Sequence, residues 1–262
     1  MGAWTEENIA KRLPSTIKSS PLSNGERSDA SGKAVGNVIL LSLPDDEYHA
    51  IRPHLEPVEM PQYRIFHEPG QKIEFAYFPH KGMTSLVALS RDGRSVEVGI
   101  VGKEGMVGMP LVMNSQRAIF RAIMQMPGMG VRIRSEVFQD ILPRTPTLGS
   151  EISRFAMMHG IQVAQLAACN RLHEVDQRLA RWLLMCQDRV DSESLPLTHE
   201  FLAQMLGAGR PSVSLAAAVL EDAGLIENRR GTVRVLNRKN LEEAACECYG
   251  VIQNFNGAMG LK

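Results

Sequence analysis

Residues 197–226 have the sequence LTHEFLAQMLGAGRPSVSLAAAVLEDAGLI, which predicts two helices joined by a tight turn. Thr198 is a favourable N-terminal cap for the first helix, and Gly207 stands where the chain turns. The second helix begins near Arg210, and Pro211 is acceptable in its first turn, where a missing N–H leaves no hydrogen bond unmade. Helical spacing places one apolar set on the inner face of this second helix: Val213, Ala216, Ala217 and Leu220.

The outer face of the second helix combines one arginine with small side chains: Arg210, Pro211, Ser212, Ser214, Leu215 and Ala218. Such a face can approach the major groove of DNA closely. Residues 227–236, ENRRGTVRVL, predict a β-hairpin that offers Arg229, Arg230 and Arg234 to phosphates. With His199 as a further phosphate contact, these residues form a predicted DNA-binding unit. The alternative is a helical hairpin that packs against another protein.

Short β-type segments precede this unit and are separated by glycine turns. We predict strands at 58–66, 75–79, 84–90, 95–101, 118–126 and 130–134, after one helix within 40–55. Asp92-Gly93 is the strongest hairpin signal, and alternation along the next strand predicts a core face made of Val96, Val98 and Ile100, with Glu97 and Gly99 opposite. Strands this short and evenly spaced favour a small antiparallel barrel or jelly roll.

Helical patterns follow at 137–142, 148–172 and 174–189, and a polar link at 191–196 leads to the DNA-binding unit. The longest pattern is apolar on two sides, with Ile152, Phe155 and Leu166 on one stripe and Met158, Ile161 and Ala168 on another. A helix buried on two faces needs two partners. We expect the barrel to be one and the same helix of a second copy to be the other, giving a two-fold homodimer. The alternative is a helix buried within one subunit.

Composition excludes several classes of protein. The 262 residues are enough for two domains, and 29 basic residues balance 29 acidic ones, so any polyanion site must be local. Apolar runs are too short for a membrane span, and the start of the chain lacks a secretory signal, so we expect a cytoplasmic protein. The first 36 residues are polar and serine-rich and predict a flexible tail.

Metal and catalytic motifs are missing from the sequence. The four cysteines form no Cys-x-x-Cys pair and are interpreted as reduced thiols. Cys246 and Cys248 fall in an expected C-terminal helix, where they would point in different directions, so no metal site is predicted. The histidines show no metal-binding spacing and no nucleophile motif is present, so the protein is not expected to be an enzyme.

The stretch 197–226 resembles the winged helix-turn-helix of the Crp/Fnr transcriptional regulators, and the order of elements fits that family from about 38 to 240. The resemblance implies an α+β chain: a cyclic-nucleotide-binding-like β-roll at 37–147, a dimerisation helix at 148–172 and a DNA-binding domain at 173–262. It also implies double-stranded DNA and RNA polymerase as partners. Two recognition helices about 34 Å apart would bind a near-palindromic operator.

Carried over by position, Arg210 matches the arginine that contacts guanine in many members, and Ser212 matches a hydroxyl residue near phosphate. Pro211 replaces a glutamate that usually contacts a base, and Leu215 replaces a frequent second arginine. The best-known half-sites of the family are therefore not expected, and Leu215 would instead touch a thymine methyl group. An interaction or ligand-binding module that has lost specific DNA recognition is the alternative function.

Members that bind cyclic AMP carry Gly-Glu-Leu and then Arg-Ser or Arg-Thr in the roll. This chain has Gly108-Met109-Pro110 and then Gln116-Arg117-Ala118, so binding of cyclic AMP is not expected. A different small-molecule effector would use Gly108, Met109, Arg117 and Arg121. The cysteine cluster that iron–sulfur members keep near the N-terminus is missing here, because no cysteine precedes Cys169.

Overall fold

The computed structural model describes residues 27–190 and 192–258. Most of the predicted flexible tail, residues 1–26, lies outside them. Residues 27–36 are packed on the roll: Ser28 bridges Ala34, Val35 is buried, and the Asp29 carboxylate accepts hydrogen bonds from the backbone N–H groups of Ser31 and Lys33. The prediction of a flexible tail was therefore wrong for residues 27–36. The Asp29 side chain closes a turn in this segment, and the buried Val35 side chain anchors the segment.

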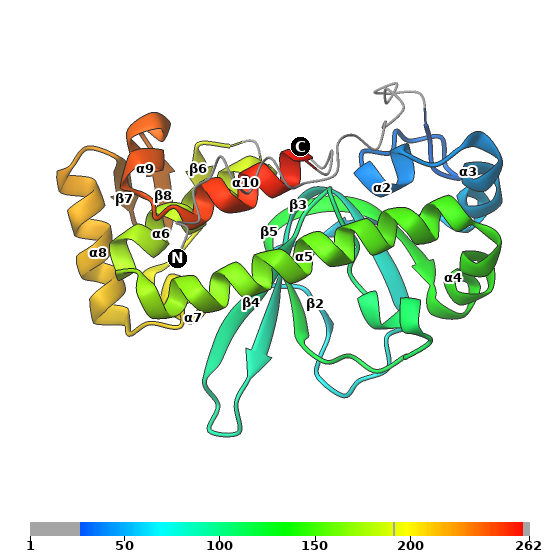
Figure 1. The fold of residues 1–262 in the computed structure, drawn as a ribbon, viewed down its shortest axis with the longest axis horizontal. Coiled ribbons are helices and arrows are strands. Elements are labelled where there is room, and N and C mark those ends of the chain that lie inside the picture. The colour runs from blue at the N-terminus through cyan, green and yellow to red at the C-terminus, as the bar shows by residue number, and fades with distance from the viewer. Residues whose placement is uncertain (1–26, 191, 259–262) are drawn as a thin grey trace, which may run out of the picture.

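The fold is α+β, as the sequence predicts (Figure 1). An antiparallel sheet in the order β1-β5-β3-β4, with β2 also paired to β5, forms the N-terminal roll. The helix α5 runs across the molecule beside the roll and leads to a unit of helices with a second sheet in the order β6-β8-β7. Within the described part of the chain, no helix is both long and apolar enough to cross a bilayer.

The roll consists of β1 (Glu56–Met60), β2 (Ile65–His67), β3 (Phe75–Leu89), β4 (Ser95–Val101) and β5 (Arg121–Arg134). The prediction of separate strands on either side of Lys81-Gly82 and Pro127-Gly128 was wrong, because these dipeptides lie inside β3 and β5 and oppose each other. The register shifts between Pro79 and Thr84. A Cβ on Gly82 would lie 2.6 Å from the Met126 carbonyl oxygen, and one on Gly128 would collide with the Lys81 carbonyl. Glycines here permit a close backbone crossing, so they mark bulges and not strand ends.

The hairpin predicted at Asp92-Gly93 is confirmed, and Gly93 adopts a φ of +84°. The prediction of which face of β4 is buried was wrong. Glu97 is 5% exposed and Gly99 is buried, whereas Val96 and Val98 are half-buried. A bulge between Leu86 and Val87 shifts the register, and helices cover the side of β4 that was expected to face water.

Short helices precede and follow the strands. The single helix expected within 40–55 is divided into α2 (Val38–Leu41), α3 (Asp45–Ile51) and the 3-10 turn η1 (Arg52–His54). Pro44 stands at the N-terminal cap of α3, where its extended ψ of 159° separates the two helices. Further short elements are η2 (Met109–Met113), α4 (Ser135–Ile141) and η3 (Leu142–Arg144).

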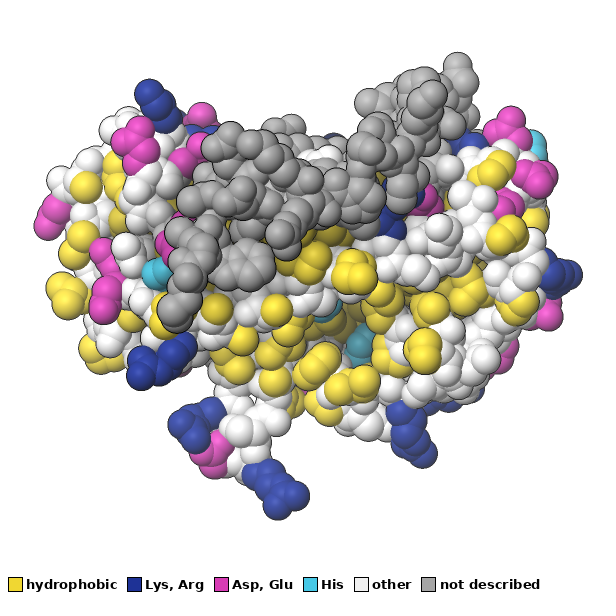
Figure 2. All heavy atoms as spheres, viewed as in Figure 1, with side chains coloured by type: hydrophobic (Ala, Val, Ile, Leu, Met, Phe, Trp, Pro, Cys, Tyr) yellow, Lys and Arg dark blue, Asp and Glu magenta, His cyan; other side chains and the backbone are white. Residues whose placement is uncertain are grey.

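The helix α5 (Pro146–Leu172) buries Ile152, Phe155 and Leu166, as predicted, and Ile152 and Phe155 pack in the core of the roll. The second predicted stripe is not a single face, because Met158 is buried while Ala168 is exposed. The outward line of α5 instead contains Met157, Ile161, Ala164, Ala168 and Leu172. Figure 2 shows apolar side chains gathered along the middle of this view, where α5 runs.

The C-terminal part consists of α6 (Val175–Val190), β6 (Ser194–Leu195), α7 (His199–Leu206), α8 (Arg210–Asp222), β7 (Ile226–Arg229), β8 (Thr232–Val235), α9 (Arg238–Ala244) and α10 (Cys248–Ala258). Residues 194–195 were predicted as a link but pair with β8. Cys246 lies between α9 and α10 and Cys248 begins α10, so the prediction of one helix holding both was wrong. Both thiols are buried.

One hydrophobic core joins the roll to this C-terminal part. Met83, Val87, Ile100 and Met126 from the roll pack with buried residues of α6, α7 and α8. A second core fills the roll and includes Phe155 of α5. The roll and the C-terminal helices are therefore fixed together by apolar contact.

Candidate nucleic-acid interface

The turn between α7 and α8 has the geometry expected from its sequence. The Thr198 hydroxyl accepts a hydrogen bond from the Phe201 N–H at 3.2 Å and caps α7. Gly207 ends α7 with a φ of +58°, a conformation that glycine adopts without strain. Gly209 then caps α8, and Pro211 lies in the first turn as predicted.

The two faces of α8 differ as predicted. The inner face is buried and consists of Val213, Ala216, Ala217 and Leu220. On the outer face, Leu215 is 70% and Val219 is 48% exposed, and Arg210, Pro211 and Ser212 are also exposed. Arg210 Nε lies 3.9 Å from a Glu200 carboxylate oxygen, at the outer limit of an ion pair. Because both side chains are exposed, this pair adds little stability and leaves the guanidinium free to reorient.

His199 and Ser214 are used inside the unit. His199 Nδ1 lies 3.0 Å from the Ser214 hydroxyl, and Nε2 lies 3.4 Å from the side-chain oxygen of Asn228 in β7. The prediction of His199 as a phosphate contact is therefore not supported, since both ring nitrogens connect α7 to α8 and to the hairpin. Sequence spacing alone did not reveal this role, which requires the packing of all three elements.

Asn228 extends the same network to the last turn of α8. Its backbone N–H donates to the Glu221 carboxylate at 2.7 Å, and its side-chain amide donates to the other carboxylate oxygen at 3.2 Å. These two hydrogen bonds lower the pKa of Glu221, the backbone one most. The hairpin is thus held at a fixed position beside α8.

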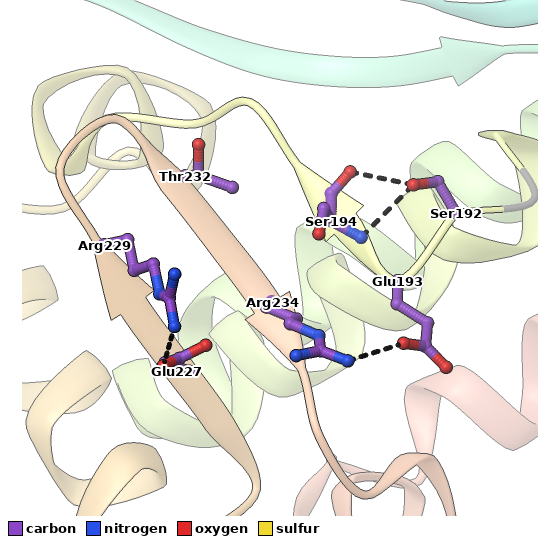
Figure 3. Close-up of a pocket in the computed structure, with 7 residues that line it drawn as sticks. All are labelled: Ser192, Glu193, Ser194, Glu227, Arg229, Thr232 and Arg234. Atoms are coloured by element: carbon purple, nitrogen blue, oxygen red, sulfur yellow. Dashed lines mark hydrogen bonds and ion pairs between the residues drawn. The ribbon is translucent and has the colours of Figure 1, made fainter.

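The β7–β8 hairpin turns at Arg230-Gly231, with Gly231 at a φ of +76°. Arg229 and Arg234 share the outer face of the small sheet, over a hollow of about 420 Å³ (Figure 3). Arg229 donates to Glu227 at 2.9 Å and Arg234 to Glu193 at 3.3 Å. Arg230 is exposed at the tip. Because all three guanidiniums remain accessible, phosphates can replace the carboxylates as partners.

Comparisons with known proteins agree with this geometry. A family model described as the Crp-like helix-turn-helix domain matches residues 177–244, which include α7, α8 and the hairpin. The search of curated proteins found no match. A solved structure of the c-di-GMP responsive global regulator CLP of Xanthomonas campestris is 19% identical, covers 73% of this chain and 99% of that chain, and has a TM-score of 0.61.

Two further solved structures have the same fold. A transcriptional regulator of the crp/fnr family from Eubacterium rectale is 18% identical, with coverage of 79% of this chain and 97% of that chain and a TM-score of 0.62. FixK2 from Bradyrhizobium japonicum is 13% identical, with coverage of 73% and 98% and a TM-score of 0.62. Residues 177–244 therefore match the Crp-like helix-turn-helix domain, and the chain has the fold of Crp/Fnr transcriptional regulators. No enzyme family is indicated by these similarities.

The helix-turn-helix domain is docked on the roll by contacts that the sequence did not predict. Trp182 Nε1 of α6 donates to the buried Glu97 carboxylate of β4 at 2.9 Å. The Gln62 side-chain amide donates to the Pro196 carbonyl at 3.0 Å. At the turn itself, a Cβ on Gly207 would lie 2.8 Å from Val96 Cγ2, so the β3–β4 hairpin touches the helix-turn-helix directly.

The four residues of the roll that were predicted to bind an effector lie in two different environments. Arg121 is paired with Glu68, with Nη2 at 2.9 Å from the carboxylate, and Arg117 donates to the Gly70 carbonyl at 2.9 Å. Gly108 is buried against the Phe75 carbonyl, where it caps η2 with a φ of +110°, and Met109 packs on the roll core. The two arginines thus bind the 68–70 segment, whereas the other two residues belong to the core wall.

Proposed function

We propose that the protein is a homodimeric, sequence-specific DNA-binding transcription regulator that binds a near-palindromic operator and acts with RNA polymerase. The observation that carries this proposal is the exposed face of α8. Arg210, Pro211, Ser212 and Leu215 face outward, while the opposite side of α8 is buried in the core. A rigid helix with small side chains behind an N-terminal arginine suits the major groove.

The outward line of α5 supports the dimer. Met157 is 62% and Leu172 is 72% exposed, and Ile161, Ala164 and Ala168 lie between them at helical spacing. An exposed apolar line of this length on a helix favours association with another helix. A two-fold pair of α5 helices would bury both lines and place two copies of α8 on one duplex.

The β3–β4 hairpin supports a further part of the proposal, in which the roll passes a signal to the DNA-binding unit. A groove of about 790 Å³ lies between this hairpin and the helix-turn-helix, and its lining includes Ser90, Arg94, Val96, Gly207 and Arg210. Movement of the hairpin would therefore first displace the start of α8.

Selection of duplexes from a random pool by the full-length protein, without added ligand, tests this function. We expect enrichment of a motif with two-fold related halves separated by about one helical turn. Enrichment of a single half-site would contradict the dimer. Failure to enrich any sequence, while random duplex is still retained, would favour the interaction module that has lost specific recognition.

A further inference from the structure

Four side chains with metal-binding atoms converge where α5 ends. Cys169 lies in the last turn of α5 and His173 directly follows that helix. Cys246 lies in the link between α9 and α10, and Cys248 is the first residue of α10. One ligand atom from each residue lies within 4.8 Å of all the others. The three cysteines are buried, and the His173 side chain is 14% exposed.

The spacing of these atoms fits one tetrahedral ion. The Cys169 and Cys246 sulfurs are 3.4 Å apart, and the Cys248 sulfur is 3.4 Å from His173 Nδ1. In a tetrahedral zinc site, with zinc–sulfur bonds of about 2.3 Å, neighbouring ligands lie about 3.8 Å apart. Small shifts of the side chains would therefore admit the ion. A multi-iron cluster would require wider separation of the sulfurs, because several iron and sulfide ions would stand between them.

A second layer of polar groups holds the ligands. His173 Nε2 lies 3.1 Å from a Glu247 carboxylate oxygen, which leaves Nδ1 directed at the sulfurs. A carboxylate on the distal ring nitrogen is the arrangement that commonly orients a zinc-bound histidine. The Gln165 side-chain amide donates to the Cys248 sulfur at 3.1 Å, as suits a thiolate.

The charge around the cluster favours an anionic centre. Arg181 of α6 is 2% exposed, and its Nε finds no hydrogen-bond partner within the part of the chain that the structure describes. The guanidinium of Arg181 lies near enough to Cys169 and Cys246 for its positive charge to act on both sulfurs. A buried cation is stabilised by a nearby negative charge. Three thiolates on a divalent ion leave a net negative charge beside this guanidinium.

We propose that Cys169, His173, Cys246 and Cys248 form a structural zinc site. All four positions are filled by the protein, which is typical of a site that stabilises a fold and not of a catalytic one. The ion would bind the end of α5 to the α9–α10 link. The site would thus fix the junction at which α5 passes into the DNA-binding unit.

The zinc content of the untagged, full-length protein, purified under reducing conditions, tests the site. We expect about one zinc per chain, released on modification of the thiols by a mercurial. Co²⁺ in its place should give the intense visible absorption of tetrahedral thiolate coordination. Cys248→Ser and Cys169→Ser should each lose the zinc, whereas Cys186→Ser should retain it, because this equally buried cysteine of α6 lies outside the cluster.

Glu247→Gln keeps the proposal testable if the cysteine variants fail to fold, because the Glu247 side chain is 69% exposed. We expect its zinc affinity, measured by competition with a chelator, to fall about 10- to 100-fold. The site is disproved if the reduced wild-type protein takes up no zinc from a zinc solution, or if Cys248→Ser retains as much as the wild type. A Cys169–Cys246 disulfide in the wild type, with no zinc uptake after reduction, would also disprove it. None of these measurements uses DNA, so the result is independent of the proposed function.

Discussion

Glu97 shows how one buried residue connects the two halves of the chain. Its carboxylate accepts hydrogen bonds from the Ser85 hydroxyl at 2.6 Å and from Trp182 Nε1 at 2.9 Å. Burial raises the pKa of Glu97 to about 7, although both hydrogen bonds oppose the shift. The folded protein therefore holds a proton here that the unfolded chain releases.

This proton predicts a pH dependence of stability. Because the pKa of Glu97 is raised from 4.5 to about 7, the folded state binds more protons within that window, and stability falls as pH rises through it. Glu97→Gln removes this ionisation and can still accept from Trp182 and donate to Ser85. We expect the variant to be more stable than the wild type at pH 8, by up to about 3 kcal/mol, with a smaller difference at pH 5. Urea unfolding at the two pH values measures this, and parallel pH dependence of the two proteins would refute it.

Arg210 is a second single residue whose role can be tested. Its exposed guanidinium can donate two hydrogen bonds to one guanine, a contact worth roughly 1–3 kcal/mol of discrimination. We expect Arg210→Ala to lower affinity for the selected operator much more than affinity for random duplex, measured by fluorescence anisotropy at one salt concentration. Arg210→Lys should not restore the difference, since an ammonium lacks the paired donors. Equal losses of affinity for the operator and for random duplex would contradict the assignment of Arg210 as a base contact.

At the scale of elements, local signals predicted much of the fold and of the candidate site. The sequence correctly predicted the helix cap at Thr198 and the turns at Gly207 and Gly231, because these conformations depend on neighbouring residues. The paired bulges at Gly82 and Gly128, the buried face of β4 and the role of His199 depend on contacts between distant segments, and sequence spacing does not contain them. The proximity of Cys169 to Cys246 also depends on contacts between distant segments, so sequence spacing does not reveal it.

The tip of the β7–β8 hairpin should contact DNA without reading its sequence. Arg230 is exposed beside Gly231 at the turn, where a guanidinium can reach phosphate. We expect Arg230→Ala to weaken binding to all duplexes about equally and to lower the slope of log affinity against log salt by about 1. Lys239→Ala, at an exposed position in α9, is the control. An unchanged affinity for random DNA would contradict the phosphate contact.

The outward line of α5 predicts the oligomeric state. Ala168 lies within this line, between Ala164 and Leu172, and is exposed. We expect Ala168→Glu to convert a dimer to a monomer, because two carboxylates would meet near the two-fold axis without a partner. Asn170→Glu adds the same charge at an exposed position on a different side of α5 and should leave the dimer intact. Sedimentation equilibrium distinguishes the two states, and a dimeric Ala168→Glu protein would count against α5 as the interface.

At the scale of the whole molecule, the shared core predicts cooperative unfolding. Met83, Val87, Ile100 and Met126 of the roll pack with α6, α7 and α8, so separation of the two parts would expose apolar surface from both. We expect a single thermal transition, with coincident midpoints in tryptophan fluorescence and far-ultraviolet circular dichroism at one protein concentration. Two resolved transitions would show that the roll and the DNA-binding unit are stabilised separately.

The contact between Val96 and Gly207 also has a thermodynamic consequence. The hairpin that carries Val96 lies against the turn before α8, so its position and that of α8 are not independent. By linkage, a ligand of the roll that changes DNA affinity through this contact by a given factor must itself be bound more or less tightly by the same factor when DNA is present. DNA would then act as an effector of such a ligand site. For a ligand that strengthens DNA binding, protein held on an immobilised duplex would retain that ligand from a mixture of metabolites.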